Sequence, residues 1–367
     1  MKVQGFILID VDAAALNNAG VVSRAGIENT VETKKIIKEG RSYPYVSGQA
    51  WGYWWRNTLQ NDFSWNLSPV FYDKEKGIAY TEANPFEYPD DDMFGYMRAA
   101  KEIVRDKKSG EPIKAKNGKE KTEDATVTRI APLKNSALIA IGNTQIARNF
   151  SSMSRQNDFP VPYGKEEYSA IMKGMFSIDI DQVGTFSSYN KTGFKNLNDN
   201  LKEELQKKCT VIEDSFVVDK DKKKEKLLRM DVEIRKKRIE ETIKALKTIN
   251  GGAMQTNNMV DVTPKFIVLA LTKSGNHPFS HIVSTDPVHH DQSIFGVEDF
   301  KEVLNEYKDD FIGNVYVGKR GGFWNEYNCD LDDLNNFSYN GENQKVFYLP
   351  VNQAIDSFCK EINELIK

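Results

Sequence analysis

Runs of hydrophobic residues divide the chain into short strands, with longer stretches of helical spacing between them. Residues 2–10 and 174–184 have the pattern of strands, and residues 265–272 form an apolar strand after a polar loop. Helical spacing occurs at residues 48–60 and 351–366, where apolar positions recur every three or four residues. Strands interleaved with helices predict an α+β sandwich such as the ferredoxin-like fold.

Other segments are more polar. Residues 16–29 and 148–155 have few regularly spaced apolar positions, and we expect both to be loops. Residues 31–46 predict an extended segment, and residues 68–84 predict a hairpin around Lys76-Gly77. Residues 105–124 are charged and glycine-rich, which predicts a further loop within an insertion.

A long charged helix is expected at residues 224–249. Its apolar stripe consists of Leu228, Val232, Ile239, Ile243 and Leu246. The basic run at residues 235–238 lies within the same stretch. Such a run is most often a solvated face, and we expect it to be exposed.

The helix at residues 48–60 has two different faces. Ser47 is expected to be its N-cap, accepting a hydrogen bond from an amide of the first turn. One face carries tryptophans that can be buried, and the other carries Gln49 and Arg56. Free amides at a helix N-terminus can bind an anion, so this segment suits a polyanion backbone. An ordinary amphipathic helix with a serine cap explains the same pattern.

Composition describes a globular chain without a structural disulfide framework. The sequence has 367 residues, of which 40% are hydrophobic and 28% are charged. No apolar run is long enough to cross a bilayer, and residues 1–12 become acidic too early for a signal peptide, so we expect a cytoplasmic protein without membrane partners. The three cysteines are far apart and odd in number, which predicts neither disulfides nor a zinc knuckle.

The formal net charge of −3 is low for a simple nucleic-acid binder. Lysine and arginine total 50, against 53 aspartates and glutamates. This balance weakens a free-standing nucleic-acid role but is compatible with a basic groove on a mixed surface. The distribution of the charges therefore matters more than their sum.

The candidates for metal or catalytic chemistry are few. His277, His281, His289 and His290 lie in a proline-containing segment without a zincin motif, so packing or solvent roles are favoured over a metal site. The run Asp90–Asp92 could hold a divalent ion, but a helix N-terminus with an acidic first turn explains the same run without a metal and is favoured. Phosphate-binding glycine loops and nucleophile motifs do not occur in the sequence. We therefore expect no cofactor and no catalytic centre.

Nucleic-acid contacts can instead be predicted in four polar segments. Residues 16–29, 44–56 and 148–155 combine cations or amide side chains with glycine or serine, as contacts to phosphate and sugar require. The fourth segment follows Gly251 and Gly252, where asparagines surround two methionines that could wedge between stacked bases; buried methionine is the alternative. The cations of the first three segments are Arg24, Arg56, Arg148 and Arg155.

Several of these motifs, in this order, resemble a known family. Leu16-Asn17-Asn18, Arg24 and Tyr45-Val46-Ser47-Gly48-Gln49-Ala50 are followed by an arginine-ending helix. The stretches at residues 91–97, 131–155 and 251–266 complete the pattern over most of the chain. Together they look like the Cascade backbone subunit of type I CRISPR systems, a member of the "Cas seven" superfamily, in its type I-B DevR-like branch.

The resemblance implies an RRM-like palm with an inserted fingers region and a thumb. The palm would comprise residues 1–65 and 126–367, the fingers residues 66–125, and the thumb would lie within about residues 182–263. Copies would stack head to tail along a guide crRNA, with partners that include target DNA paired to the guide and the large, small and guide-end-capping Cascade subunits. The implied RNA-binding residues are Asn17, Asn18, Arg24, Ser47, Gln49, Arg56, Arg148, Arg155, Met254, Gln255, Asn257 and Met259.

A metal-dependent RNA nuclease is the alternative function. Related type III backbone subunits cut target RNA with an aspartate in the loop after the first strand. The corresponding stretch here is Leu16-Asn17-Asn18-Ala19, which contains no carboxylate. Because an amide carries no charge to hold a metal ion, we predict that the chain does not cleave RNA.

Overall fold

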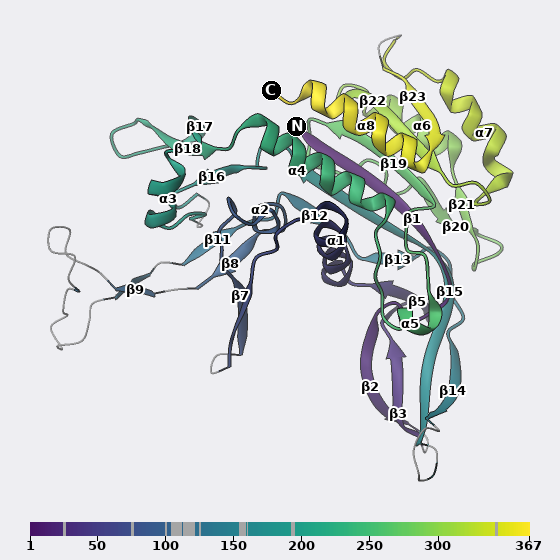
Figure 1. Ribbon diagram of the computed structural model, residues 1–367. Helices are drawn as coiled ribbons and strands as arrows, with labels where there is room; N and C mark the ends of the chain where they lie inside the picture. The colour runs from purple at the N-terminus through teal and green to yellow at the C-terminus, as the bar shows by residue number, and fades with distance from the viewer. Residues whose placement is uncertain are drawn as a thin grey trace. The chain divides into compact units, whose positions relative to one another are not determined.

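The computed structural model describes residues 1–24, 27–74, 77–99, 101–103, 112, 122–124, 126–153, 159, 161–191, 195–341 and 344–367 (Figure 1). The chain forms two compact units. Unit 1 comprises residues 1–63, 134–179 and 240–367, and unit 2 comprises residues 64–133 and 180–239. The predicted α+β class is confirmed, since helices accompany a large mixed sheet.

The sheet is built around β1 (Lys2–Ala14). β1 pairs antiparallel with β15 (Val161–Asp179) on one side and with β19 (Phe266–Thr272) on the other. β19 is buried along its whole length, as its continuous apolar pattern predicts. The strand order across the sheet is β23 (Val346–Pro350), β22 (Phe311–Lys319), β19, β1, β15, β13 (Leu138–Ala140), β5 (Arg41–Val46) and β4 (Lys35–Lys38). β12 (Leu133–Asn135) also pairs with β15.

One face of the β1–β15 pair packs against α1 (Gly48–Phe63). Gly5 lies opposite Phe176 in the register, and a Cβ on Gly5 would come within 2.1 Å of the Phe176 ring. Trp55 meets this ring edge-on at 5.2 Å, and its indole Nε1 donates to the Thr242 carbonyl oxygen at 2.7 Å. α8 (Val351–Leu365) lies along β22 in Figure 1 and buries its apolar face, which confirms the predicted amphipathic helix.

The opposite face carries the alternate side chains of the same strands. Phe6 and Leu8 of β1 pack in one cluster with Phe279 and with Phe300 of α6 (Val297–Glu306). This cluster also takes in the short elements that follow. They are β20 (Val283–Thr285), β21 (Ser293–Phe295), η2 (Asn325–Tyr327), α7 (Asn328–Asp333) and η3 (Leu334–Asn336).

A strand-built arm extends from β15. Its first half pairs antiparallel with β14 (Ala147–Met153) on one edge and parallel with β3 (Ile27–Thr33) on the other. β3 in turn pairs with β2 (Asn18–Arg24), so four strands form the arm seen in Figure 1. The predictions of loops at residues 16–29 and 148–155 are therefore wrong for the described residues 18–24, 27–29 and 148–153, which form strands. Polar strands with little buried surface lack the apolar alternation on which strand prediction depends.

In its described residues, unit 2 contains short antiparallel pairs and three helical segments. A small core is formed by Phe186, Leu197, Leu205, Leu228 and Met230. Its pairs are β6 (Val70–Asp73) with β7 (Ile78–Thr81), β8 (Tyr96–Arg98) with β11 (Val127–Arg129), β9 (Lys101–Ile103) with β10 (Thr122–Asp124), and β18 (Lys224–Arg229) between β16 (Thr185–Ser187) and β17 (Thr210–Val218). Its helices are α2 (Pro89–Phe94), α3 (Asp199–Leu205) and residues 232–239 of α4 (Val232–Lys244).

The hairpin predicted around Lys76-Gly77 is confirmed by the β6–β7 pair. The helix predicted at residues 224–249 is wrong in its first turns, because β18 occupies them and α4 begins only at Val232. Leu228 is buried as expected, but from a strand. Most of the loop predicted at residues 105–124 lies outside the described residues. In the described part of the chain, every helix is too short or too polar to cross a lipid bilayer.

Candidate nucleic-acid interface

The start of α1 is tied to the end of β1. The Ser47 hydroxyl accepts a hydrogen bond from the Ala50 amide at 3.3 Å, which confirms the predicted N-cap. The Ser47 amide donates to the side-chain oxygen of Asn17 at 3.0 Å, and the Asn17 carbonyl oxygen accepts from the Lys34 amide at 2.9 Å. Asn17 therefore holds three chain segments together in front of the helix.

The two faces of α1 separate as the sequence predicts. Trp51, Trp54 and Trp55 are buried, so their rings belong to the core. Gln49 is exposed and Arg56 is half-buried on the remaining surface. The polar side chains of this helix, and not its tryptophans, thus reach the surface where a ligand could bind.

The segment after Gly252 is hydrogen-bonded to the residue that precedes Asn17. The Ala253 amide donates to the Leu16 carbonyl oxygen at 2.9 Å. Gly252 has a φ of 110°, and a Cβ there would lie 2.6 Å from the Leu16 side chain. Only glycine combines this backbone conformation with such a close approach. The residues next to Asn17 and the predicted methionine segment are therefore neighbours.

Within this segment, a single helical turn presents the methionines. Met254 and Met259 flank α5 (Gln255–Asn258) and both have left-handed backbones, with φ of 58° and 47°. Met259 is 85% exposed, whereas Met254 is half-buried. The Gln255 side chain accepts from the Val260 amide at 2.9 Å and donates to the Gly251 carbonyl oxygen, so it closes the segment on itself. Asn257 remains exposed.

The arm contributes an ion-paired arginine. The Arg148 guanidinium lies 3.0 Å from Glu166, which also accepts from the Thr33 amide at 3.0 Å and from Lys35. Burial of the Glu166 carboxyl would raise its pKa, but these hydrogen bonds outweigh burial and lower it. Glu166 thus organises β14, β15 and β3, a role that its sequence context did not indicate.

The predicted residues are therefore brought together in part. Asn17, Ser47 and the Gly251–Met259 segment meet at the end of β1, and Asn18 starts the neighbouring β2. Arg24 closes β2 by pairing with Ile27 along the backbone. Arg148 lies in β14 of the arm, opposite Glu166 of β15, and Arg155 lies outside the described residues.

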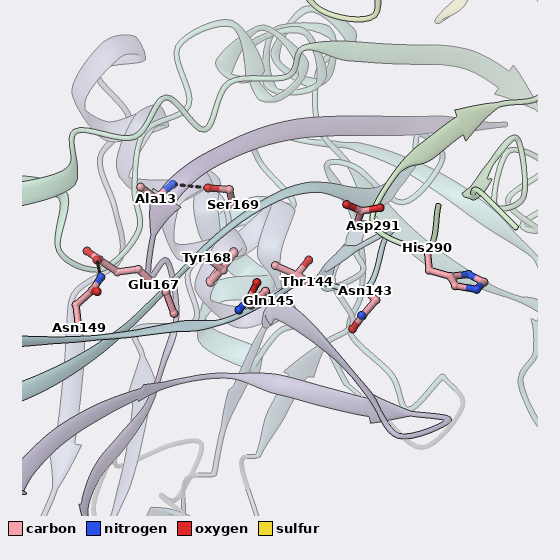
Figure 2. A pocket seen from close by; sticks show the side chains of 11 residues that line it. Ala13, Asn143, Thr144, Gln145, Asn149, Glu167, Tyr168, Ser169, His290 and Asp291 are labelled. Carbon is pink, nitrogen blue, oxygen red and sulfur yellow. Dashed lines mark hydrogen bonds between the residues drawn. The ribbon is translucent and has the colours of Figure 1, made fainter. Parts of the chain in front are cut away.

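A polar cavity of about 690 Å³ lies along the base of the arm (Figure 2). Ser169 is fixed there by accepting from the Ala13 amide at 3.0 Å, and Asn149 donates to Glu167 at 2.6 Å. Its lining comes from several parts of unit 1, namely Ala13 of β1, the β13–β14 connection, β14, β15, and residues 290–291. The sequence motifs did not identify this cavity.

A known protein family matches most of this chain. Residues 7–292 match the family described as CRISPR-associated negative auto-regulator DevR/Csa2. The protein belongs to this family. The resemblance to the DevR-like branch is thereby confirmed, and the chain is CRISPR-associated.

Two solved structures are similar to this DevR/Csa2-family chain at 9% identity. One is described as a "CRISPR RNA-guided surveillance complex", with 99% of this chain and 100% of that chain covered and a TM-score of 0.49. The other is described as the same kind of complex, pre-nicking, with 98% and 100% covered and a TM-score of 0.49. Among curated proteins, no match was found.

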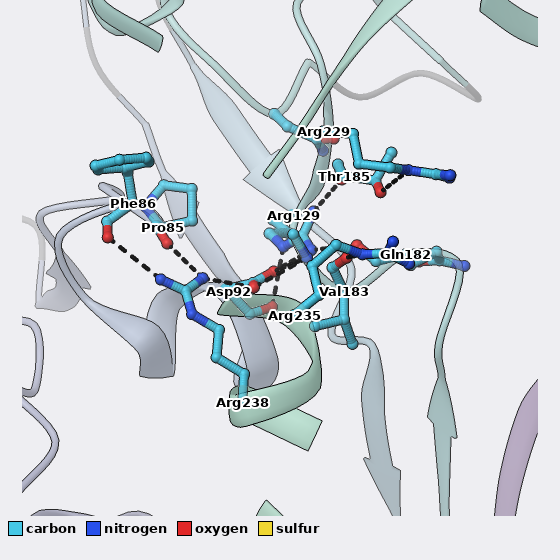
Figure 3. Close-up of polar contacts among 12 residues, drawn as sticks. Pro85, Phe86, Asp92, Arg129, Gln182, Val183, Thr185, Arg229, Arg235 and Arg238 are labelled. Carbon is cyan, nitrogen blue, oxygen red and sulfur yellow. Dashed lines mark hydrogen bonds and ion pairs between the residues drawn. The ribbon is translucent and has the colours of Figure 1, made fainter. Parts of the chain in front are cut away.

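The acidic run Asp90–Asp92 lies in unit 2, and Figure 3 shows the contacts of Asp92. Asp92 is fully buried and is paired with Arg238 at 2.6 Å and with Arg129. Asp90 accepts from the Ser68 amide at 2.9 Å, and Asp91 accepts from the Asn84 amide at 2.9 Å. Amide and guanidinium donors thus surround these carboxylates. This environment fits the acidic first turn of a helix better than a metal site.

Arg235 and Arg238 correct the prediction of a solvated basic face. They are only 3% and 5% exposed. Arg235 donates to the Val183 and Ile180 carbonyl oxygens, and Arg238 donates to the Pro85 carbonyl oxygen as well as to Asp92. A helix packed on unit 2 can bury these cations because carbonyl and carboxylate partners come from distant segments.

The histidines do not form a metal cluster in the described residues. His277 Nε2 lies 3.0 Å from the Gly5 carbonyl oxygen, and burial lowers the pKa of its imidazole, so it has the packing role that was favoured. Throughout the described ranges, no three His, Cys, Asp or Glu side chains lie close enough together to share a metal ion.

Proposed function

We propose that this DevR/Csa2-family protein is a non-catalytic crRNA-binding backbone subunit of a type I, specifically I-B, Cascade complex. The observation that carries the proposal is the meeting of Asn17, Ser47 and the Gly251–Met259 segment at the end of β1. These segments are far apart in sequence. The first two were predicted to contact the nucleic-acid backbone, and the third to place methionines between stacked bases. Their proximity brings the Asn17 side chain, the Ser47 hydroxyl and the first turn of α1 to one place, where phosphate and sugar contacts could form.

In this proposal the side chains have separate roles. Asn17 and Ser47 order the helix N-terminus, and Asn18, Gln49, Arg56 and Arg24 contact the guide backbone. Met259 and Met254 act as the wedge that displaces a nucleotide. Gln255 stiffens the wedge and Asn257 contacts the guide. Arg148 and Arg155 extend the contact along the arm.

The finer architecture belongs to the same proposal. An RRM-like palm comprises residues 1–65 and 126–367, with fingers at 66–125 and a thumb within about 182–263. Copies stack head to tail in the cytoplasm, so that acidic and basic faces neutralise each other. The guide in this filament pairs with target DNA, and the large, small and end-capping subunits complete the assembly.

Purification of the complex assembled in cells tests the proposal. We expect RNA of regular length to copurify, and Arg56→Ala to reduce the bound amount irrespective of guide sequence. Lys360→Ala, on the exposed side of α8, is the matched control and should retain RNA. A monomer without RNA after coexpression with its guide would refute the proposal.

Catalysis is tested separately by adding magnesium and target RNA to the same complex. The stretch Leu16-Asn17-Asn18-Ala19, which corresponds to the loop with the catalytic aspartate in related nucleases, contains no carboxylate, and the Asn17 side-chain oxygen accepts from the Ser47 amide. We expect the target RNA to stay intact. Cuts at regular intervals would show that the subunit is a nuclease.

A further inference from the structure

The β17–β18 hairpin of unit 2 contains a wide irregularity. Glu213 is opposite Lys226, and Val218 is opposite Lys224, so residues 214–217 of β17 face a single residue of β18. A bulge of this kind bends a strand and redirects its side chains. The hairpin lies within the range of about residues 182–263 that is proposed to contain the thumb, but it is separate from the Gly251–Met259 segment assigned above to the wedge.

Asp214 fixes this bulge from within. It is fully buried, and one carboxylate oxygen accepts from the Phe216 amide at 2.8 Å and from the Val217 amide at 3.3 Å. The other oxygen accepts from the Tyr189 hydroxyl and the Lys191 ammonium group. Burial would raise the pKa of this carboxyl, but the hydrogen bonds outweigh burial and lower it. The backbone around Phe216 is therefore pre-organised.

Phe216 projects from the bulge into solvent. Its side chain is 89% exposed, although a phenyl ring gains from burial. The bulge that keeps this ring exposed requires the Asp214 carboxylate to be buried, and removing that carboxylate from water costs free energy. A ligand that packs on the ring would bury its apolar surface and offset this free-energy cost.

Lysines follow Phe216 in the sequence of the hairpin tip. Residues 216–226 contain five lysines and three carboxylates. Asp219 is occupied in the turn, where it accepts from the Asp221 and Lys223 amides at 2.8 Å each. The exposed lysines are Lys220, Lys222, Lys223, Lys224 and Lys226. An exposed ring with a cationic turn matches a single-stranded nucleic acid, whose bases stack while its phosphates are neutralised.

We propose that the β17–β18 tip is a binding site for single-stranded nucleic acid, with Phe216 stacking on a base and the tip lysines contacting phosphates. The contacts proposed here, stacking of Phe216 on a base and lysine contacts to phosphates, do not involve the ribose 2′-hydroxyl. The site should therefore accept DNA and RNA single strands alike. Duplex DNA should bind more weakly, since its bases are already stacked.

The test is a titration of the guide-loaded full-length complex with fluorescent single strands of DNA and RNA, about 20 nucleotides long, and with duplex DNA. We expect Phe216→Ala to weaken single-strand binding roughly tenfold and Phe216→Tyr to preserve it. Lys220→Gln and Lys223→Gln should each reduce the slope of log affinity against log salt by about 0.7. Val288→Ala, at another exposed apolar position, is the matched control.

Copurified guide RNA is quantified in the same preparations. The proposal predicts unchanged guide content in Phe216→Ala, and this keeps its outcome distinct from that of the guide-binding proposal. Equal single-strand affinity in wild type and Phe216→Ala would overturn it. Loss of the guide in this variant would also overturn it, because the tip would then belong to the guide groove. The ring is exposed, so the variant should keep the wild-type unfolding transition.

Discussion

The Asn17 side-chain oxygen accepts a hydrogen bond from the Ser47 amide at 3.0 Å, although the two residues are 30 positions apart. This contact joins the end of the central strand to the N-cap of α1. It also gives an uncharged amide a structural role at this position, in keeping with the proposal of a chain that binds RNA without cutting it. The Asn17 side-chain oxygen thus stabilises the fold, whereas the neighbouring polar residues are the ones proposed to contact RNA.

We expect Asn17→Ala to lower the free energy of unfolding by about 1 kcal/mol, because the Ser47 amide loses its acceptor. RNA retention should fall with it, since the helix start is no longer held. Asn17→Asp keeps an oxygen in place and should restore stability, while its negative charge still weakens RNA retention. Urea unfolding and RNA quantification measure both effects, and unchanged stability in Asn17→Ala would contradict the assigned role.

Asp92 is expected to be essential for unit 2. Asp92→Asn leaves the buried Arg129 and Arg238 guanidinium groups without their carboxylate, which should cost about 3–5 kcal/mol. Asp199→Asn is the control, because that carboxylate is 74% exposed and its pair with Lys195 should contribute less than about 1 kcal/mol. Chemical denaturation compares the two variants, and equal effects would show that the buried cluster is not stabilising.

Glu166 should make the stability of the arm depend on pH. Its pKa is lowered below the ordinary value of 4.5, so its contribution is complete above that pH and is lost as the pH falls through the folded-state pKa. Glu166→Gln should therefore cost about 1.5–3 kcal/mol at pH 7 and progressively less in acid. Denaturation of both proteins from neutral pH into acid measures this convergence. A difference that is constant or grows in acid would exclude the ionised carboxylate as the cause.

Gly5 allows β1 to pass beneath the Phe176 ring. Gly5→Ala would place a methyl group 2.1 Å from that ring and should cost about 1–3 kcal/mol. Adding Phe176→Leu should recover part of this loss, because the smaller side chain leaves room. Gly321→Ala is the control, since a methyl group there would meet no atom within 4 Å beyond its chain neighbours. Additive effects of the first two substitutions would show that the ring contact is not the cause.

Local patterns in the sequence determined much of unit 1. The cap at Ser47, the buried tryptophans of α1, the continuous apolar run of β19 and the amphipathic α8 all follow from neighbouring residues. Each depends on side-chain spacing or on hydrogen bonds within one turn, and such signals are contained in a short window. The family resemblance likewise depended on motif order.

Only the tertiary structure decided the remaining features. The polar strands β2 and β14 exist because β3 and β15 supply backbone partners. Arg238, in the basic run of α4, is buried because Asp92, 146 residues away in the sequence, pairs with it. The exposed Phe216 depends on a buried carboxylate with donors from Tyr189 and Lys191. Polar strands and buried charges are stable only with partners that the fold brings from afar, and local periodicity contains no information about those partners.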